Sequence, residues 1–424
     1  MGARKRPHAV PVTRVSRSAA SGYAAPAMSS SPFAAHFPAL RSGFSFLDNA
    51  AGAQVPSHTI EAISQFLSGG SCNVGMPYPA SVRATEVKAQ ARAATAEFLH
   101  CKPEEVMLGT SATALTFQLG RAFSRLFQPG DEVVISELEH ESNASPWRAL
   151  EAQGAVVKVW RARWPEGRLA PEDLRPLLSP RTRLVAVTAA ANSVGTMPDV
   201  AAAAELAHSV GAWVIVDAVH ASPHQLPDVK AWGADFAVFS PYKVFGPHLG
   251  CMYVRHELLP RLPADKLWFV PDDSPQKFEP GTANHEGLAG WLGSLRYVRE
   301  VLGDGQSGRA GLEQAFRRIE SLERPLLEST LERLLSHERV KLYGIPEPKG
   351  RAATFCFNVR GASPRGVAEH LARNGVGVAA GHYYATLAMQ ALTLMPEGAV
   401  RVSLLHYNTR EDVDRLFSAL DSLP

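Results

Sequence analysis

The chain has 424 residues, enough for two or three ordinary domains or for one large α/β unit with an appendage. Its 46% hydrophobic and 20% charged residues are typical of a globular protein with a sizeable core, and a net charge of +2 argues against a dedicated nucleic-acid-binding protein. No apolar run approaches the roughly 20 residues that span a bilayer. Four scattered cysteines without a C-x-x-C pair favour reduced thiols, so we expect a cytoplasmic protein.

Residues 1–38 form a basic segment that contains five lysine or arginine residues and no acidic residue. The segment lacks the apolar core of a secretory signal, and its prolines disfavour the amphipathic helix of an organellar transit peptide. We therefore predict a disordered tail over 1–38, or a chain whose synthesis starts at Met28.

Short apolar runs alternate with helical patterns from about residue 104 to residue 255. Their continuous Val, Ile and Phe content, without strict alternation, is typical of strands covered on both faces. Helices are expected over 112–126 and 199–210, with Pro198 in the first turn of the second. The runs interpreted as strands are 104–109, 132–139, 156–160, 183–189, 213–219, 236–240 and 250–255.

Beyond about residue 280 the pattern changes to long helices followed by a few strands. Helices are expected over 286–302 and 312–337, the second bent at Pro325, and strands over 354–359, 375–380 and 399–407. Thr409 and Asp412 fit a near-capping-box start for a last helix. The apolar residues of this helix fall at helical spacing on one face: Val413, Leu416, Phe417 and Leu420.

The alternation of strands and helices predicts an α/β fold, a doubly wound and mainly parallel sheet of seven strands followed by a small C-terminal α+β domain. We assign 1–38 to the tail, 39–300 to the large domain and 301–424 to the small domain. The first residues of the large domain are expected to pack with the small one.

Polar residues follow the strands at the edge where open α/β sheets bind ligands. The segment after 104–109 is Gly-Thr-Ser-Ala-Thr, small residues that open a helix and suit a phosphate group. His140, Asn192, Asp217 and Lys243 each follow or end a further strand. Each residue alone is weak evidence for a functional site, because an aspartate can cap a helix and a histidine can lie in a core. Their joint position at one edge of the sheet indicates a ligand-binding site.

A helix start that suits a phosphate group, together with Asp217 and the strand-end lysine Lys243, predicts pyridoxal 5′-phosphate (PLP) as the cofactor. A lysine amine forms a Schiff base with the aldehyde of this cofactor, and a carboxylate keeps the pyridinium nitrogen protonated. The alternative for Lys243, a solvated surface lysine, conflicts with the apolar runs on both sides of it.

Several separated segments of the sequence together resemble the class V aminotransferase family, in particular cysteine desulfurase-like proteins of fold type I. They are LDNAAGAQVP, GTSAT, EHESNASPW, DAVH, FSPYKVFGPHLG, FEPGTANHEG and VRVSLLHYNTREDVDRL, in this order from about residue 44 to the C-terminus. The resemblance implies a PLP-dependent transferase fold of type I and a homodimer that acts on a small amino acid substrate.

The resemblance also implies a role for individual residues. Lys243 corresponds to the lysine of the internal aldimine, Asp217 to the partner of the pyridinium nitrogen and His140 to the ring-stacking histidine. Arg401 corresponds to the arginine that binds the substrate carboxylate as a bidentate pair. The remaining contacts that the resemblance implies are Thr110, Ser111, Ser240 and Tyr242 at the phosphate, His220 at the ring oxygen, Asn192 at the ring oxygen or the substrate carboxylate, and Thr282 at the partner subunit's phosphate.

The resemblance fails at the residue that defines a desulfurase. Desulfurases carry a mobile cysteine that attacks the substrate sulfur, whereas Tyr384 stands at that position here and Ala379 stands where the related proteins have an arginine. A phenol forms no persulfide. Tyr383 and Tyr384 either act on the departing group or line the substrate pocket.

These departures predict a carbon–sulfur lyase, or another lyase or substitution enzyme acting at Cβ of an amino acid. The alternative is a class V aminotransferase or an epimerase of specialised metabolism. A metal hydrolase built on Asp217, His220 and His224 is a weaker interpretation, because Pro223 interrupts any helix that would present both histidines. A scaffold protein without catalysis would be expected to lack Lys243 or Asp217, and both are present.

Overall fold

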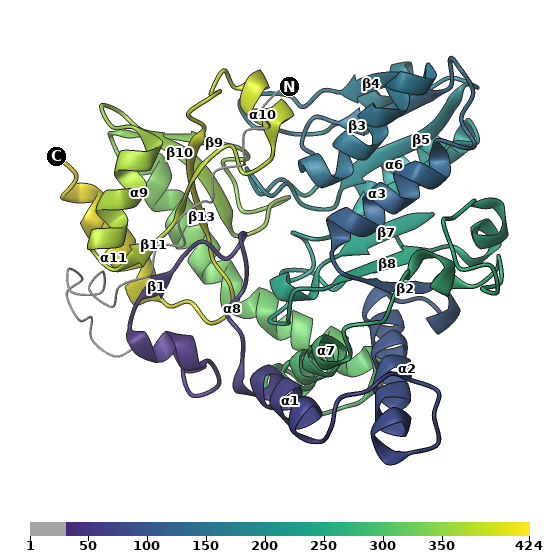
Figure 1. Ribbon diagram of the computed structural model, residues 1–424. Helices are drawn as coiled ribbons and strands as arrows, with labels where there is room; N and C mark the ends of the chain where they lie inside the picture. Colours follow the sequence, from purple (N-terminus) through teal and green to yellow (C-terminus); the bar gives the residue numbers. More distant parts are fainter. Residues whose placement is uncertain (1–30) are drawn as a thin grey trace, which may run out of the picture.

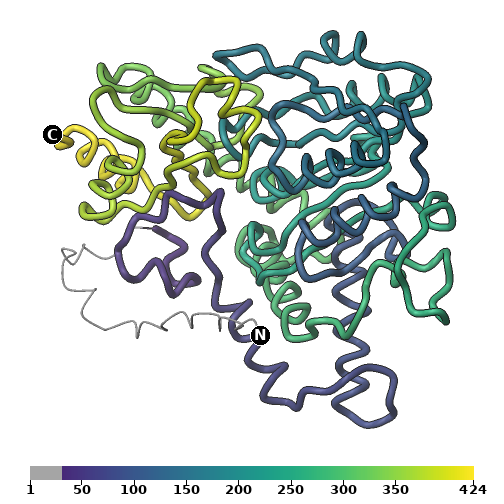
Figure 2. The backbone as a smooth tube through the Cα atoms, turned by 45° about the horizontal axis from the view of Figure 1, so that its top comes forward, coloured from purple at the N-terminus to yellow at the C-terminus, as the bar shows by residue number. Residues whose placement is uncertain are grey.

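The structure is a computed structural model that describes residues 31–424 (Figures 1 and 2). One sheet of seven strands forms its larger half, in the order β2-β8-β7-β6-β5-β3-β4. All neighbours in this sheet pair in parallel except β8, which is antiparallel to both β2 and β7. The strands are β2 (Val106–Gly109), β3 (Glu132–Ser136), β4 (Val156–Trp160), β5 (Thr182–Thr188), β6 (Trp213–Asp217), β7 (Phe236–Phe239) and β8 (Gly250–Val254).

Both faces of this sheet are buried. Alternate residues of β5 enter different apolar clusters: Val185 and Val187 pack in one, Leu184 and Ala186 in the other. This burial explains the continuous apolar runs in the sequence and confirms the predicted, mainly parallel seven-stranded sheet. The helices in this part of the chain are α1 (Ser57–Ser68), α2 (Pro79–Leu99), α3 (Ala112–Phe123), α4 (Ser145–Arg148), α5 (Pro171–Leu174), α6 (Val200–Ser209) and α7 (His285–Tyr297), the last continued by a π-helical turn, η10 (Val298–Leu302).

A smaller antiparallel sheet forms the other half of the molecule, in the order β12-β13-β10-β9. Its strands are β9 (Val340–Tyr343), β10 (Thr354–Val359), β12 (Ala379–Gly381) and β13 (Ala399–Ser403), accompanied by α9 (Pro364–Arg373), α10 (Thr386–Ala391) and α11 (Arg410–Asp421). The long helix α8 (Gly308–Ser336) runs from beside α7 to the small sheet, where it packs against β9, so it connects the two halves of the molecule (Figure 1). Division of the chain near residue 300 into two domains stays a prediction.

The N-terminal part of the described chain crosses to the half of the molecule that holds the smaller sheet and forms a separate two-stranded sheet there. Strand β1 (Ser45–Phe46) pairs in parallel with β11 (Val376–Gly377), and Figure 2 shows this purple segment beside the yellow C-terminal elements. Phe33 and Phe37 are buried and lie against His406, so packing begins before residue 38, where the predicted tail was to end. Residues 1–30 of that predicted tail lie outside the described residues.

Several sequence-based boundaries were wrong. The strand expected over 375–380 is two short strands with different partners: β11 pairs with β1 in a two-stranded sheet, and β12 pairs with β13 in the four-stranded sheet. The strand expected over 399–407 ends at Ser403. Pro198 precedes α6 instead of lying in its first turn, since Asp199 caps that helix through its side chain. Within residues 31–424, no helix combines the length and apolar character that crossing a bilayer requires.

Candidate active site

A cavity of about 250 Å³ lies at the edge of the large sheet where β5, β6 and β7 end, facing the small sheet. Nine of the residues that the sequence predicted for the site line it: His140, Asn192, Asp217, His220, Ser240, Tyr242, Lys243, Tyr384 and Arg401. Parallel strands bring their carboxyl ends to one edge, which is why residues distant in sequence meet here.

A short 3₁₀ turn, η7 (Pro241–Lys243), directs Lys243 into this cavity. Backbone bonds from Lys243 N–H to the Ser240 carbonyl (3.0 Å) and from Gly246 N–H to the Pro241 carbonyl (2.9 Å) hold the turn. Phe245 adopts a left-handed backbone with φ of 61°, a conformation uncommon for a residue with a side chain. Its ring is fully buried, so packing holds this strained turn in place.

The Lys243 amine is buried and donates a hydrogen bond to the carbonyl of Ala50. Burial, and next the nearby Arg401 charge, lower the pKa of Lys243 to about 7, while Asp48 and Asp217 oppose that shift. A substantial share of the amine is therefore neutral near pH 7, which is the nucleophilic form.

Asp217 is the last residue of β6 and lines the cavity. Burial raises the pKa of its carboxyl to about 6, opposed by the Val219 N–H, which donates to it at 2.8 Å, and by the charge of Lys243. No cation among residues 31–424 forms a direct ion pair with it. A positively charged group bound in the cavity would favour the ionised carboxylate.

His140 lies in the cavity wall with a defined tautomer. The Ser142 N–H donates to its Nδ1 at 3.0 Å, so Nδ1 accepts and the ring proton lies on Nε2. Burial, and next the charge of Lys243, lower its pKa to about 4, which keeps the ring neutral. Ser142 also lines the cavity, and the sequence analysis did not single it out.

Three buried polar atoms of cavity residues have no partner among residues 31–424: Asn192 Oδ1, His220 Nδ1 and Arg401 Nε. The other atoms of these groups are fixed. His220 Nε2 pairs with the Thr354 hydroxyl at 2.9 Å, and Asn192 Nδ2 donates to the Tyr383 carbonyl at 2.8 Å. Leaving buried polar atoms unpaired costs free energy, so the cavity is matched to a polar ligand that pairs with them.

The N-terminus of α3 opens on the same cavity through Ala112 and Thr113. A Cβ on Gly250 would lie 2.2 Å from the Ser111 carbonyl carbon, so this approach of α3 to β8 requires a glycine. The first N–H groups of a helix lack intrahelical partners and suit an anion. The predicted phosphate contacts Thr110 and Ser111 do not line the cavity: Thr110 is exposed, and Ser111 accepts a hydrogen bond from Ala114 N–H as the helix cap.

Thr282 is exposed and does not line this cavity.

Asp48 is the main partner that the sequence analysis missed. Its carboxylate pairs with Arg401 at 2.8 Å, and the backbone carbonyl of Asn192 accepts from the same guanidinium at 3.0 Å. The ring of Tyr383 packs against that guanidinium, 4.6 Å from its central carbon to the ring centre. The signal available was Asp48 itself, in the segment LDNAAG, but its partner lies 353 residues later.

Residues 45–416 match the model of the aminotransferase class-V family. The chain belongs to the class V aminotransferases. It is 34% identical over 411 residues to the aminotransferase-like protein FGM3 of Gibberella zeae, covering 93% of this chain and 99% of that protein. It is 33% identical to probable cysteine desulfurase 1 of Mycobacterium leprae, covering 87% of this chain and 60% of that protein. The cysteine desulfurase of Thermococcus onnurineus superposes with a TM-score of 0.84 at 27% identity, over 94% of this chain and 99% of that one.

The class V aminotransferases are PLP-dependent enzymes of fold type I, and the cysteine desulfurase-like resemblance of the sequence is confirmed. The cavity of this class V protein fits the cofactor of its family. It offers a buried amine of lowered pKa, a buried carboxyl without an ion-pair partner, an open helix N-terminus and unpaired atoms on Asn192 and His220.

Proposed function

We propose that the protein binds PLP through Lys243 and acts on an amino acid, most simply as a lyase or substitution enzyme at Cβ. The observation that carries this proposal is the placement of Lys243, Asp217 and Arg401 around one cavity. When bound, the cofactor supplies an aldehyde that condenses with amines and a ring that withdraws electrons from Cα of the attached amino acid.

The residues of this chain have distinct tasks in this proposal. Asp217 pairs with the ring nitrogen, the N-terminus of α3 and Ser240 bind the phosphate, and neutral His140 lies against the ring. Asn192 and His220 donate to or accept from the ring oxygen. Arg401, already oriented by Asp48, binds the substrate carboxylate, and Lys243 Nζ moves the proton at Cα. Thr110, Ser111 and Tyr242 stay predicted contacts at the phosphate.

The first test is cofactor binding. The purified protein should show the visible absorption of bound PLP, and borohydride reduction followed by mass spectrometry should place the pyridoxyl group on Lys243. Lys243→Ala should lose both signals, whereas Lys341→Ala, at a lysine of β9 outside the cavity, should keep them. A pyridoxyl group on another lysine in the unaltered protein would refute the assignment.

The lyase proposal rests on Tyr384 and on the positions of the four cysteines. Tyr384 lines the cavity where desulfurases carry their nucleophilic cysteine, and none of the four cysteines lines it. Cys356 lies beside Arg401 in the next strand, but it is buried, and burial raises the pKa of its thiol to about 12. A protonated, buried thiol is a poor nucleophile, so transfer of sulfur through an enzyme persulfide is not expected.

The aminotransferase alternative is favoured by the name of the FGM3 relative, which is described as aminotransferase-like. A lyase and an aminotransferase differ in their need for an amino acceptor, whereas an epimerase, which only inverts Cα, needs no acceptor and releases no pyruvate. A lyase acting on L-cysteine or O-acetyl-L-serine releases pyruvate and ammonia without a 2-oxo acid, whereas an aminotransferase forms product only when a 2-oxo acid is supplied. Alanine formation together with a persulfide on any cysteine would instead restore a desulfurase, and replacement of all four cysteines by alanine would then abolish turnover.

We also propose that the working form is a homodimer. An exposed apolar cluster, Leu267, Trp268 and Phe269, lies in the segment that leads to Thr282, and Trp268 is 91% exposed. Clustered exposed aromatic residues are typical of interfaces. Since Thr282 lies away from its own cavity, a second subunit supplies the phosphate that it contacts. A cytoplasmic location stays a prediction.

A further inference from the structure

Two adjacent tyrosines, Tyr383 and Tyr384, line the candidate active site, and both have a left-handed backbone, with φ of 52° and 57°. This conformation is uncommon for residues with large side chains, so contacts in the surrounding structure must hold it. Two backbone bonds hold the turn: the Tyr384 carbonyl accepts from Glu141 N–H at 2.8 Å, and the His382 carbonyl accepts from Ala385 N–H at 2.8 Å. The rings of the two tyrosines lie in different surroundings.

The ring of Tyr384 lies near the surface. Tyr384 is 64% exposed, and its ring centre lies 5.5 Å from that of His140 and 5.7 Å from that of His382. The tyrosine ring that packs against Arg401 is the ring of Tyr383. Two neighbouring residues of the same type and the same backbone conformation therefore differ in what they contact.

Tyr383 is held at three points. Its hydroxyl donates to the carbonyl of Ala399, its ring centre lies 4.6 Å from the central carbon of the Arg401 guanidinium, and its carbonyl accepts from Asn192 Nδ2 at 2.8 Å. Ala399 and Arg401 are two residues apart in β13, so the hydroxyl fixes the ring beside the strand that carries the arginine. Burial, and next the nearby Cys356, raise the pKa of the Tyr383 phenol well above its usual value, so its hydroxyl keeps its proton.

The guanidinium of Arg401 is fixed on several sides. It is buried, pairs with Asp48 at 2.8 Å and donates to the Asn192 carbonyl at 3.0 Å, while the ring of Tyr383 packs against it. Its Nε has no partner among residues 31–424. A guanidinium binds a carboxylate through two parallel N–H bonds only when its plane is correctly turned, and an aromatic ring stacked on it restricts that plane.

We propose that Tyr383 is a positioning residue of the substrate site, whose ring sets the plane of the Arg401 guanidinium and whose carbonyl sets the amide of Asn192. The two atoms left unpaired, Arg401 Nε and Asn192 Oδ1, then stay available to one bound amino acid. Tyr383 takes no part in proton transfer, because its hydroxyl is committed to Ala399. The inference rests on the proposed function for one point, the binding of the substrate carboxylate by Arg401.

The test compares two probes by isothermal calorimetry of the holoenzyme, 2-methylalanine and 2-methylalaninamide, at one pH and one salt concentration. Neither probe has a hydrogen at Cα to lose, and the amide has nearly the same shape without the carboxylate charge. The ratio of the two affinities therefore reports the carboxylate contact. A general loosening of the site weakens both probes alike and leaves this ratio unchanged, so a merely structural role of Tyr383 would not move it.

Tyr383→Leu should lower the preference for 2-methylalanine about fivefold, which is comparable with the loss of a cation–π contact. Tyr383→Phe keeps the ring and should retain most of the preference, whereas Arg401→Gln should remove it. The matched control is Tyr384→Leu, which replaces the neighbouring tyrosine of the same backbone conformation. Whatever this change does to the two absolute affinities, their ratio should stay the same.

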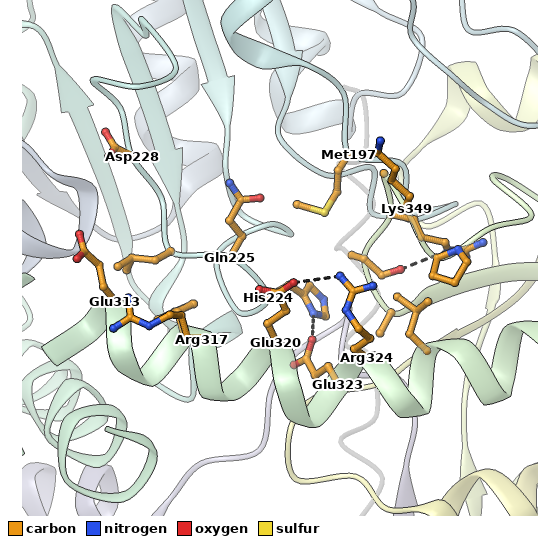
Figure 3. A pocket seen from close by; sticks show the side chains of 18 of the residues that line it. Met197, His224, Gln225, Asp228, Glu313, Arg317, Glu320, Glu323, Arg324 and Lys349 are labelled. Carbon is orange, nitrogen blue, oxygen red and sulfur yellow. Dashed lines mark hydrogen bonds and ion pairs between the residues drawn. The ribbon is translucent and has the colours of Figure 1, made fainter. Parts of the chain in front are cut away.

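A second control tests the loss of positive charge in Arg401→Gln. Lys349→Gln removes one cation from a separate groove, which lies between α8 and the loops 224–228 and 348–353 (Figure 3). Lys349 does not line the candidate active site, so its replacement should leave the ratio unchanged.

Two results would overturn the inference and leave the proposed function standing. They are an unchanged ratio in Tyr383→Leu while Arg401→Gln loses the preference, or an equal fall of the ratio in Tyr383→Leu and Tyr384→Leu. A preference that survives in Arg401→Gln would instead contradict the proposed role of Arg401, and the inference with it. The failure of the inference alone is therefore distinguishable from the failure of the proposed function.

Discussion

At the scale of single residues, the pKa of the Lys243 amine depends on charges that act in opposite directions. Burial and Arg401 lower its pKa, and the carboxylates of Asp48 and Asp217 raise it. Asp48 also orients Arg401 through their 2.8 Å ion pair, so one carboxylate acts on both the proposed nucleophile and the proposed substrate-binding group. Asp48 is therefore a positioning residue whose effect is measurable through the titration of Lys243.

We predict that the rate at which the apoprotein captures PLP rises with pH, with a midpoint near pH 7. The neutral amine is the reactive form, and the pKa of Lys243 is lowered from 10.5 to about 7. Asp48→Asn removes a charge that raises this pKa, so the midpoint should move to lower pH. Stopped-flow absorption measures the pH midpoint of the capture rate. The control is Asp414→Asn, at a distant and exposed aspartate. A midpoint near 10, or an equal shift in both variants, would contradict this account.

At the scale of elements, the strands of the large sheet were predictable because their apolar runs are continuous and each ends in a polar residue. The errors lie at strand ends, such as 213–219, which stops at Asp217. There the backbone turns to present the carboxylate, and composition alone does not mark the turn. The run 375–380 was misjudged for another reason, since its two halves pair with strands distant in sequence.

The cap of α11 was predicted from the sequence and is confirmed. The Thr409 hydroxyl accepts from Asp412 N–H at 3.3 Å, and the Asp412 carboxylate accepts from Thr409 N–H at 3.0 Å. Thr409→Ala should lower the free energy of unfolding by about 1 kcal/mol, the usual effect of losing such a cap. Urea unfolding measures this change.

The matched control for this prediction is Ser307→Ala. Ser307 occupies the same position at the start of α8, but its side chain makes no capping bond. Its replacement should change the free energy of unfolding by less than about 0.5 kcal/mol. Equal destabilisation by both variants would show that the hydroxyl of Thr409 does not stabilise α11.

At the scale of the whole molecule, the site is assembled between the two sheets and is expected to be completed by a second subunit. Replacing the exposed aromatic residues, Trp268→Ser with Phe269→Ser, should shift the protein from dimer to monomer in sedimentation velocity, because the dimer loses buried apolar area. Leu335→Ser, at an exposed leucine near the end of α8, is the control and should leave the dimer intact. A monomeric unaltered protein would contradict the proposal directly.

Mixed subunits test whether Thr282 acts across this interface. In a heterodimer of Lys243→Ala and Thr282→Ala chains, a trans contact places both lesions in one site and leaves the other site intact. Each heterodimer should then have about half the activity of the unaltered dimer, so random mixing of equal amounts should restore about a quarter. If Thr282 acts within its own chain, each site carries one lesion, and mixing restores nothing.

The sequence by itself determined the sheet, the family and the side chains at its ligand-binding edge. A strand-end residue such as Lys243 or Asp217 is placed by its own strand, and parallel strands bring their ends to one edge whatever the loops between them do. Only the tertiary structure decided which groups meet across the two sheets. Asp48 and Arg401 are 353 residues apart, and their contact depends on β1 crossing to β11. The groove between α8 and the loops 224–228 and 348–353 likewise exists only because α8 packs against loops from different parts of the chain, and no local pattern encodes that packing.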